Sequence, residues 1–327
     1  MRFGLTLNPQ APADASATAL ADSLITQTQM AEEFDYDYVK ISQHYLSDYN
    51  QLQVIPMLGR VAAECRSIGI ASGLIVLPLH HPIMIAEQVA TLTTLVDEVY
   101  VGVGAGYRDI EFENFGIPKS ERVARLVEGV QIMNLLWTEE SVDYDGKVYS
   151  LRDATINPRP ESKPPIWIGA NAEKAVKRAA KLADAWLIPM HNTIAEIKEQ
   201  KCEYDEIRRE RGMDTAVPLS RETFVAPTTE EAVAVGRTYL ASKYEQYVRW
   251  GQHEAMDDET ELKQAFDRLA EDRFLLGTPE EICAELDRYQ EELEISDFII
   301  RLHWPGLPYE EAYDCIELFG DEVIPYV

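Results

Sequence analysis

The chain has 327 residues, and 46% of them are hydrophobic, which is enough apolar side chain for a sizeable folded core. Acidic residues outnumber basic ones by 57 to 30, so the formal charge is −27 at pH 7. This charge repels nucleic acid and anionic lipid and disfavours both as partners. No apolar run approaches the roughly 18 residues that a membrane span needs.

The acidic residues are spread along the whole chain, and lysine is scarcer than arginine. Excess carboxylates stay hydrated in concentrated salt, which predicts a halophilic source; an ordinary acidic bacterial protein is the alternative interpretation. The first residues, MRFGLTLNP, begin directly with a strand pattern and show no signal peptide. We therefore expect a soluble, cytoplasmic protein.

Short β-rich runs alternate with helical segments along the chain. We expect strands at 2–8, 38–44, 68–78, 99–106, 166–171, 185–190, 220–226 and 297–304. Helices are expected at about 16–34, 54–65, 82–95, 119–137, 172–182, 193–211 and 309–320, and Asp145-Gly146 predicts a hairpin with a type I′ turn. Eight strand–helix units predict an α/β fold of the (β/α)8 barrel type. A doubly wound sheet fits less well, because no GxGxxG follows the first strand.

The segment of about 227–296, between the seventh and eighth strands, is predicted to be a mostly helical insertion. Within it, Tyr244, Tyr247 and Trp250 follow one another at i, i+3 and i+6, which favours a packed helix face over a substrate wall. No linker rich in proline, glycine or serine divides the chain. We therefore predict a single domain over residues 1–327.

In such a barrel the functional residues lie at the carboxyl ends of the strands. Residues with useful chemistry at these predicted ends are His44, Gly104, Gly106, Tyr107, Gly169, Ala170, Asn171, His191, His303 and Trp304. The two glycines at 104 and 106 allow a flat ligand to approach the backbone closely. His44 is the strongest candidate for proton transfer near pH 7, although a hydrogen-bonded rim histidine without a chemical role has the same pattern.

The Gly169-Ala170-Asn171 junction leads from a strand into a helix, where free amides and the helix dipole favour a phosphate group. Asn171 also fits as the N-cap of that helix. The adjacent His80 and His81 do not face one site, and no HExxH or GxSxG motif occurs, so neither a metal site nor a hydrolase is predicted.

Five segments together resemble the bacterial luciferase-like flavin-dependent oxidoreductases. They are LPLHHPIMIAEQVATL (77–92), VGVGAGYRDIEFENFGIP (101–118), PPIWIGAN (164–171), LLGTPEEICAEL (275–286) and RLHWPGLPYEEAYDCIELFGDEVIP (301–325). The resemblance follows the chain in order over essentially its whole length. It implies a (β/α)8 barrel whose insertion often forms a lid over the substrate.

The resemblance also implies a cofactor, which is either reduced FMN used with molecular oxygen or the 8-hydroxy-5-deazaflavin coenzyme (F-420) used for hydride transfer. By position, a cis peptide beneath the cofactor ring falls at Gly73-Leu74, the active-site histidine is His44, and the phosphate lies at Gly169, Ala170 and Asn171.

Three departures from the family pattern refine these expectations. Gly104 and Ala105 stand where luciferase has a cysteine and a phosphate-binding arginine, which argues against light emission. Gln43 stands where many deazaflavin enzymes carry an acid, which favours FMN.

The leading hypothesis is therefore a monooxygenase that uses reduced FMN, supplied by a separate reductase, on a small organic substrate contacted by Tyr107, His191, His303 and Trp304. One alternative is deazaflavin-dependent hydride transfer on the same barrel. Another is a non-catalytic flavin-binding partner subunit. A homodimer is the oligomeric state that the resemblance implies.

Overall fold

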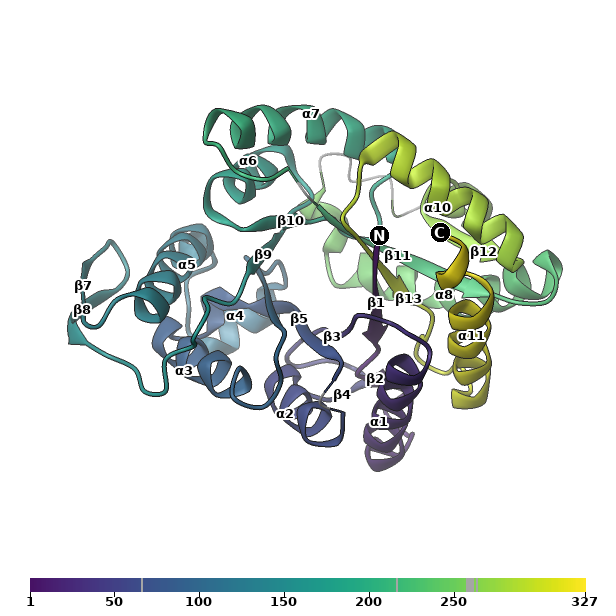
Figure 1. The fold of residues 1–327 in the computed structure, drawn as a ribbon, viewed down its shortest axis with the longest axis horizontal. Coiled ribbons are helices and arrows are strands. Elements are labelled where there is room, and N and C mark those ends of the chain that lie inside the picture. The colour runs from purple at the N-terminus through teal and green to yellow at the C-terminus, as the bar shows by residue number, and fades with distance from the viewer. Residues whose placement is uncertain (66, 216, 257–261, 263) are drawn as a thin grey trace.

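Parallel strands form a barrel at the centre of the molecule (Figure 1). The computed structural model describes residues 1–327 except 66, 216, 257–261 and 263. The barrel strands are β1 (Arg2–Leu7), β3 (Tyr38–Ile41), β5 (Gly69–Val76), β6 (Val99–Gly104), β9 (Ile166–Gly169), β10 (Ala185–Leu187), β11 (Pro218–Val225) and β13 (Asp297–Arg301). They pair in the order β10-β9-β6-β5-β3-β1-β13-β11, and a parallel bridge between Ile188 and Leu219 joins β10 to β11. Each strand overlaps a predicted one, and the predicted barrel fold is confirmed.

Helices surround the strands on the outside (Figure 1). The α-helices are α1 (Ala17–Glu33), α2 (Val54–Glu64), α3 (Pro82–Leu92), α4 (Asp109–Phe115), α5 (Arg122–Thr138), α6 (Glu173–Leu182), α7 (Ile194–Glu210), α8 (Thr229–Arg249), α9 (Phe266–Ala270), α10 (Pro279–Leu293) and α11 (Tyr309–Glu322). Short 3-10 helices occupy Leu77–Leu79, Lys119–Glu121, Gln252–Ala255 and Ile324–Tyr326. None of the helices among the described residues combines the length and the apolar character needed to cross a bilayer.

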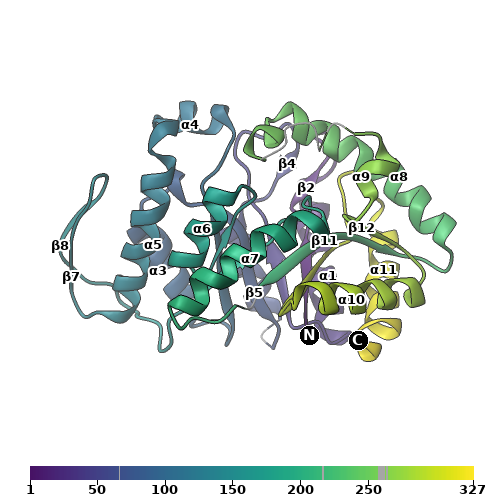
Figure 2. The ribbon, with the colours of Figure 1, turned by 90° about the horizontal axis from the view of Figure 1, so that it is seen from above.

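The two ends of the barrel differ. Figure 2 shows α4, α8 and the short antiparallel pair of β2 (Gln10–Ala11) and β4 (Asn50–Gln51) at one end, and both termini at the other. The strands run toward the end that carries α4 and α8, because these elements follow strand carboxyl ends. Function is therefore expected at that end.

Alternation of side chains along the strands sorts the core into two layers. In β3, Val39 belongs to the large core that includes residues of the surrounding helices, whereas Tyr38 packs inside the barrel with Trp167 and Ile299. The Tyr100 ring stacks on Trp167 with 4.6 Å between ring centroids. These rings fill the amino-terminal part of the barrel, and the cavity described below lies above them.

The predicted hairpin is present as β7 (Val142–Asp145) and β8 (Ser150–Ala154), but its turn is not type I′. Four residues, 146–149, connect the strands, and Gly146 lacks the positive φ that a type I′ turn requires. The Glu128 carboxylate on α5 instead accepts hydrogen bonds of 2.9–3.0 Å from the backbone N–H groups of residues 147–149. The helix that precedes the hairpin thus sets the loop, which the turn residues alone could not reveal.

The segment between β11 and β13 contains a strand that the sequence does not predict. β12 (Phe274–Gly277) pairs in parallel with the end of β11, Glu222–Val225, beyond the short pairing of β10. Its sequence is a four-residue apolar run directly before a helix, and periodicity cannot separate such a run from the helix itself. The predicted insertion of 227–296 is thus not wholly helical. Its inclusion in one domain stays a prediction.

Candidate functional site

A cavity of about 440 Å3 opens at the carboxyl ends of the strands. Ten of the predicted site residues line it: His44, Gly73, Leu74, Gly104, Gly106, Tyr107, Gly169, Ala170, Asn171 and His191. The barrel therefore brings together residues that are up to 147 positions apart (191 − 44 = 147). Their individual roles stay predictions.

His303 and Trp304 lie elsewhere. His303 is buried, with its Nδ1 3.4 Å from the Gln27 side-chain nitrogen on α1. Trp304 is fully buried and donates its indole N–H to the Glu222 carboxylate at 2.5 Å. Neither residue lines the cavity, so their predicted contact with the substrate has no support in this geometry.

Leu74 forms a platform at one side of the cavity. The pairing of β5 with β6 shifts between Ser72 and Ile75, and the Gly73-Leu74 peptide within this irregular stretch is cis, which confirms the predicted cis bond. A Cβ atom on Gly104 or on Gly169 would lie 2.9 or 2.5 Å from Leu74 Cδ1. Glycine at both positions thus leaves room for the Leu74 side chain among three strand ends. This arrangement suits a flat ring laid over Leu74.

Cationic side chains gather where β9 leads into α6. The α6 N-cap is Ala172 and not Asn171, and no side-chain hydrogen bond caps this helix, so Asn171 does not have the predicted capping role. Arg122, Lys174 and Arg178 line the cavity here. Burial, and then the charge of Arg122, lower the pKa of Arg178. Among the described residues, neither arginine forms an ion pair with a carboxylate.

This cluster fits a phosphate group. Helix amides without a side-chain cap and unpaired guanidinium groups are both donors that phosphate oxygens accept well. In a chain of net charge −27, a group of three cations at one cavity is also a local inversion of sign. The geometry is compatible with the predicted phosphate site at Gly169, Ala170 and Asn171, which stays a prediction, and three cationic side chains line the cavity beside it.

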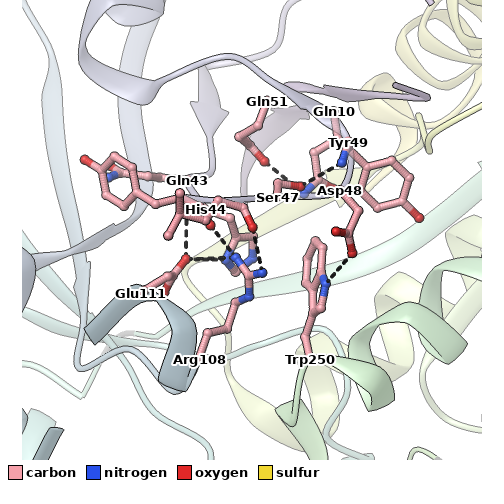
Figure 3. Close-up of polar contacts among 12 residues, drawn as sticks. Gln10, Gln43, His44, Ser47, Asp48, Tyr49, Gln51, Arg108, Glu111 and Trp250 are labelled. Atoms are coloured by element: carbon pink, nitrogen blue, oxygen red, sulfur yellow. Dashed lines mark hydrogen bonds and ion pairs between the residues drawn. The ribbon is translucent and has the colours of Figure 1, made fainter. Parts of the chain in front are cut away.

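His44 follows β3 and lies beside a buried carboxylate (Figure 3). Its Nδ1 lies 3.6 Å from the Glu111 Oε1 on α4, and the same oxygen accepts a bond from the Tyr45 backbone N–H at 2.9 Å and from Arg108 at 3.2 Å. Burial raises the pKa of Glu111, but the contacts with His44, Tyr45 and Arg108 outweigh burial and bring the pKa below its ordinary value. Glu111 is therefore ionised at neutral pH and lies beside the Nδ1 edge of the imidazole, at a distance longer than a hydrogen bond, and Nδ1 has no hydrogen-bond partner among the described residues.

Arg108 does not turn into the cavity. Its guanidinium donates to the carbonyls of Tyr45 and Leu46 and lies 4.4 Å from the centroid of the Trp250 ring (Figure 3). Asp48 accepts a bond from the Trp250 indole N–H at 3.4 Å. Arg108 thus joins the loop after β3 to the segment after β11 and also contacts the Glu111 carboxylate that lies beside His44.

Aromatic rings enclose His44. The ring centroids of Trp250, Tyr107 and Tyr247 lie 5.2, 6.1 and 6.5 Å from that of the imidazole. Tyr247 lines the cavity, whereas Tyr244 is buried in the core. The predicted aromatic face of α8 therefore serves both uses, one residue packing inward and another forming a cavity wall.

The inner end of the cavity holds buried polar groups that the sequence analysis missed. Lys40 in β3 donates to the Ser220 hydroxyl in β11 at 2.9 Å, and Arg301 at the end of β13 lies beside them. His191 completes this inner end, and neither of its ring nitrogens has a hydrogen-bond partner among the described residues. A period-two pattern places Lys40 on the same face as Tyr38, so its inward direction was readable from the strand. The sequence did not reveal that Glu111, Arg122 and Arg178 lie at or near the cavity, because their positions depend on how α4, α5 and α6 pack.

We expect Lys40→Met to raise the free energy of unfolding at about pH 6.5 and to raise it less at about pH 9.5. Burial, and then the charge of Arg301, lower the pKa of Lys40 to about 7, whereas a lysine of the unfolded chain titrates near pH 10.4. Between these values the unfolded chain binds one more proton than the folded one, so wild-type stability rises with pH and the variant lacks this rise.

Urea unfolding of both proteins at the two pH values measures this difference. The exposed Lys174 gives a matched control, because Lys174→Met should change stability equally at both pH values. A pH-independent difference between Lys40→Met and the wild type would contradict the prediction.

Comparison with known proteins identifies relatives over nearly the whole chain. Residues 1–293 match the family model described as luciferase-like monooxygenase. An F420-dependent glucose-6-phosphate dehydrogenase of Microbacterium testaceum is 27% identical over 327 residues, which cover 90% of each chain. The enzyme of the same name from Beutenbergia cavernae is 32% identical over 184 residues, covering 53% of this chain and 54% of that protein.

The fold has close counterparts among solved structures. Monooxygenase RslO1 from Streptomyces bottropensis superposes with a TM-score of 0.86, at 23% identity and with 99% of both chains covered. At this identity the superposition speaks for the fold alone. The family match spans most of the chain and includes the strand ends that build the cavity. This chain belongs to the luciferase-like monooxygenase family.

Proposed function

We propose that the protein is an oxidoreductase that transfers a hydride between a deazaflavin coenzyme and a small organic substrate. The observation that carries the proposal is the layout of one cavity, which is lined by Leu74 as a platform, by Arg178 at a cationic end and by His44 next to a buried carboxylate. A relative aligned over 90% of the chain is named as a deazaflavin-dependent dehydrogenase, which favours this coenzyme over FMN.

When bound, the deazaflavin supplies the hydride chemistry, and the protein supplies position and protons. Leu74 would support the ring, and Arg122, Lys174 and Arg178 would hold the phosphate. The Glu111 carboxylate lies on the Nδ1 side of His44, so Nε2 would be the ring nitrogen that exchanges a proton with a substrate hydroxyl or carbonyl oxygen. The aromatic wall of Tyr107 and Tyr247 would exclude water from the reacting atoms.

A second candidate keeps the cavity and changes the chemistry to oxygenation with reduced FMN, the leading hypothesis from the sequence. Gln43 favours it, because many deazaflavin members carry an acid at this position. In the structure Gln43 lines the cavity and its side-chain nitrogen lies 3.3 Å from His80 Nε2. Burial lowers the pKa of His80 to about 4, so this neighbour of Gln43 is neutral. Gln43 is itself uncharged, so neither side chain would place a charge next to the cofactor ring.

One experiment separates the two. The purified protein is titrated with deazaflavin and with FMN, each oxidised and reduced, in low and high salt. A panel of small alcohols and sugar phosphates is then added under air and under nitrogen. We expect tighter binding of deazaflavin, and its reduction by a substrate without oxygen uptake. Oxygen consumption in step with oxidation of reduced FMN would establish the monooxygenase instead.

Two further outcomes decide the remaining alternatives. Cofactor binding without turnover over the whole panel would favour a non-catalytic partner subunit, and binding of neither cofactor would overturn the proposal. The salt series also tests the predicted halophilic character. The homodimer and the cytoplasmic location stay predictions.

A further inference from the structure

The inner end of the cavity carries more positive than negative charge. Lys40 and Arg301 line it, and Lys243 on α8 lies close enough to both for its charge to interact with theirs. Lys243 pairs with the buried Glu222 carboxylate, which also accepts the bond from Trp304. Among the described residues, Glu222 is the one carboxylate in contact with any of these three cations.

The polar partners of the two lining cations are neutral. Lys40 donates to Ser220, and Arg301 donates to Asn8 at 3.0 Å and to the Tyr247 hydroxyl at 3.2 Å. Repulsion between the protonated Lys40 and Arg301 is therefore not offset locally, in line with the lowered pKa of Lys40. Burial of such charge is unfavourable unless an opposite charge joins it.

Some hydrogen-bonding nitrogens at the inner end of the cavity have no partner. The Arg301 Nε and both ring nitrogens of His191 have no hydrogen-bond partner among the described residues. The exposed fractions of these side chains are only 3% and 7%, and both line the cavity. Buried polar groups are rarely left without a partner, and those that are often mark a ligand position. Burial lowers the pKa of His191 to about 3, so its ring is neutral and has one N–H to donate.

This end is distinct from the cationic cluster of the phosphate junction. Arg122, Lys174 and Arg178 stand on α5 and α6, beyond the end of β9. Lys40 and Ser220 lie within β3 and β11, below the rim. One cavity thus has two cationic ends, and the proposed cofactor phosphate accounts for one of them.

We infer that the inner end of the cavity is a subsite for an anionic oxygen group of the substrate, a carboxylate or a phosphate monoester, held by Lys40, Ser220, Arg301 and His191. The assignment of this group to the substrate rests on the proposed function. Lys40 and the Arg301 Nε would donate charge-assisted bonds, and Ser220 and the neutral His191 would add one bond each. The site would then select an anionic substrate over its neutral analogue, since the analogue leaves buried cations unpaired.

The test uses protein saturated with its cofactor, so that the outer cationic end is filled. The thermal unfolding midpoint of the protein is measured at increasing concentrations of sodium phosphate or sodium acetate. Sodium chloride at equal ionic strength is the reference. We expect phosphate, acetate or both to raise the midpoint of the wild type and to bind Lys40→Met at least about tenfold more weakly. Lys40→Arg should retain the response. Lys181→Met, in the exposed last turn of α6 away from the cavity, is the matched control and should respond as the wild type does.

Other results would overturn the inference. They are a wild type that responds to neither anion, and equal anion affinity in wild type and Lys40→Met. A Lys40→Met protein that changes only the reduction potential of the bound cofactor would show that these cations serve the cofactor. Failure of the cofactor to bind would refute the proposed function but not the subsite. The same titration of the cofactor-free protein would then test it, with Lys40→Met removing inner binding and Lys174→Met outer binding.

Discussion

Replacing His44 with alanine is expected to reduce turnover at least about tenfold while leaving cofactor affinity within about twofold of the wild type. The imidazole lies against Glu111 and inside a wall of three aromatic rings, away from the cations that would hold the phosphate. Its loss therefore removes a proton carrier from the reaction and leaves the cofactor contacts in place. Steady-state kinetics and a cofactor titration on the same preparations measure both quantities.

A histidine outside the cavity gives the matched control. His81 caps α3 through its side chain, which accepts from the Ile83 backbone N–H. His81→Asn supplies a capping oxygen in place of the ring Nδ1 and should leave turnover unchanged. Equal turnover of His44→Ala and the wild type would refute the catalytic role, and a large loss of cofactor affinity would assign His44 to binding instead.

Replacing Arg178 with methionine is expected to weaken cofactor binding by about 10- to 100-fold, with turnover at saturating cofactor within about twofold of the wild type. The guanidinium lines the outer end of the cavity, and among the described residues it has no carboxylate partner, so a phosphate group would be its counter-ion. A cofactor analogue without the phosphate should bind the variant and the wild type equally, because it makes no use of the charge.

Position on α6 distinguishes this effect from a general loss of positive charge. Lys181 stands in the last turn of the same helix and is exposed, away from the cavity. Lys181→Met removes an equal charge and should bind the cofactor as tightly as the wild type. If Arg178→Met matched this control, the phosphate would have to lie elsewhere.

The barrel could be predicted from the sequence because each strand and each helix has a recognisable local pattern. Buried strands such as β5 read as unbroken apolar runs, and the helices between them show their own spacing. Strand carboxyl ends then mark the site without any knowledge of packing. For this reason His44, Tyr107, His191 and the Gly169 junction were predicted to lie at one rim, and the structure places them around one cavity.

The same rule failed for residues just past the end of β13. Being at the correct rim is not enough, because the chain after Arg301 turns His303 toward α1 and buries Trp304 against Glu222. Those directions are set by partners 276 and 82 positions away in sequence. The β12 strand was missed for a related reason, since its pairing with β11 is what distinguishes it from the start of a helix.

By itself, the sequence determined the fold class, the rim at which chemistry is possible and the family, because periodicity, glycine spacing and motif order are properties of neighbouring residues. Only the tertiary structure decided which charges meet. Glu111 lies beside His44 although the two residues belong to different strand–helix units. The Lys40–Ser220 contact likewise joins two strands that are far apart in sequence. Electrostatic contacts of this kind depend on distance through space, and burial strengthens them, while a linear sequence records neither quantity.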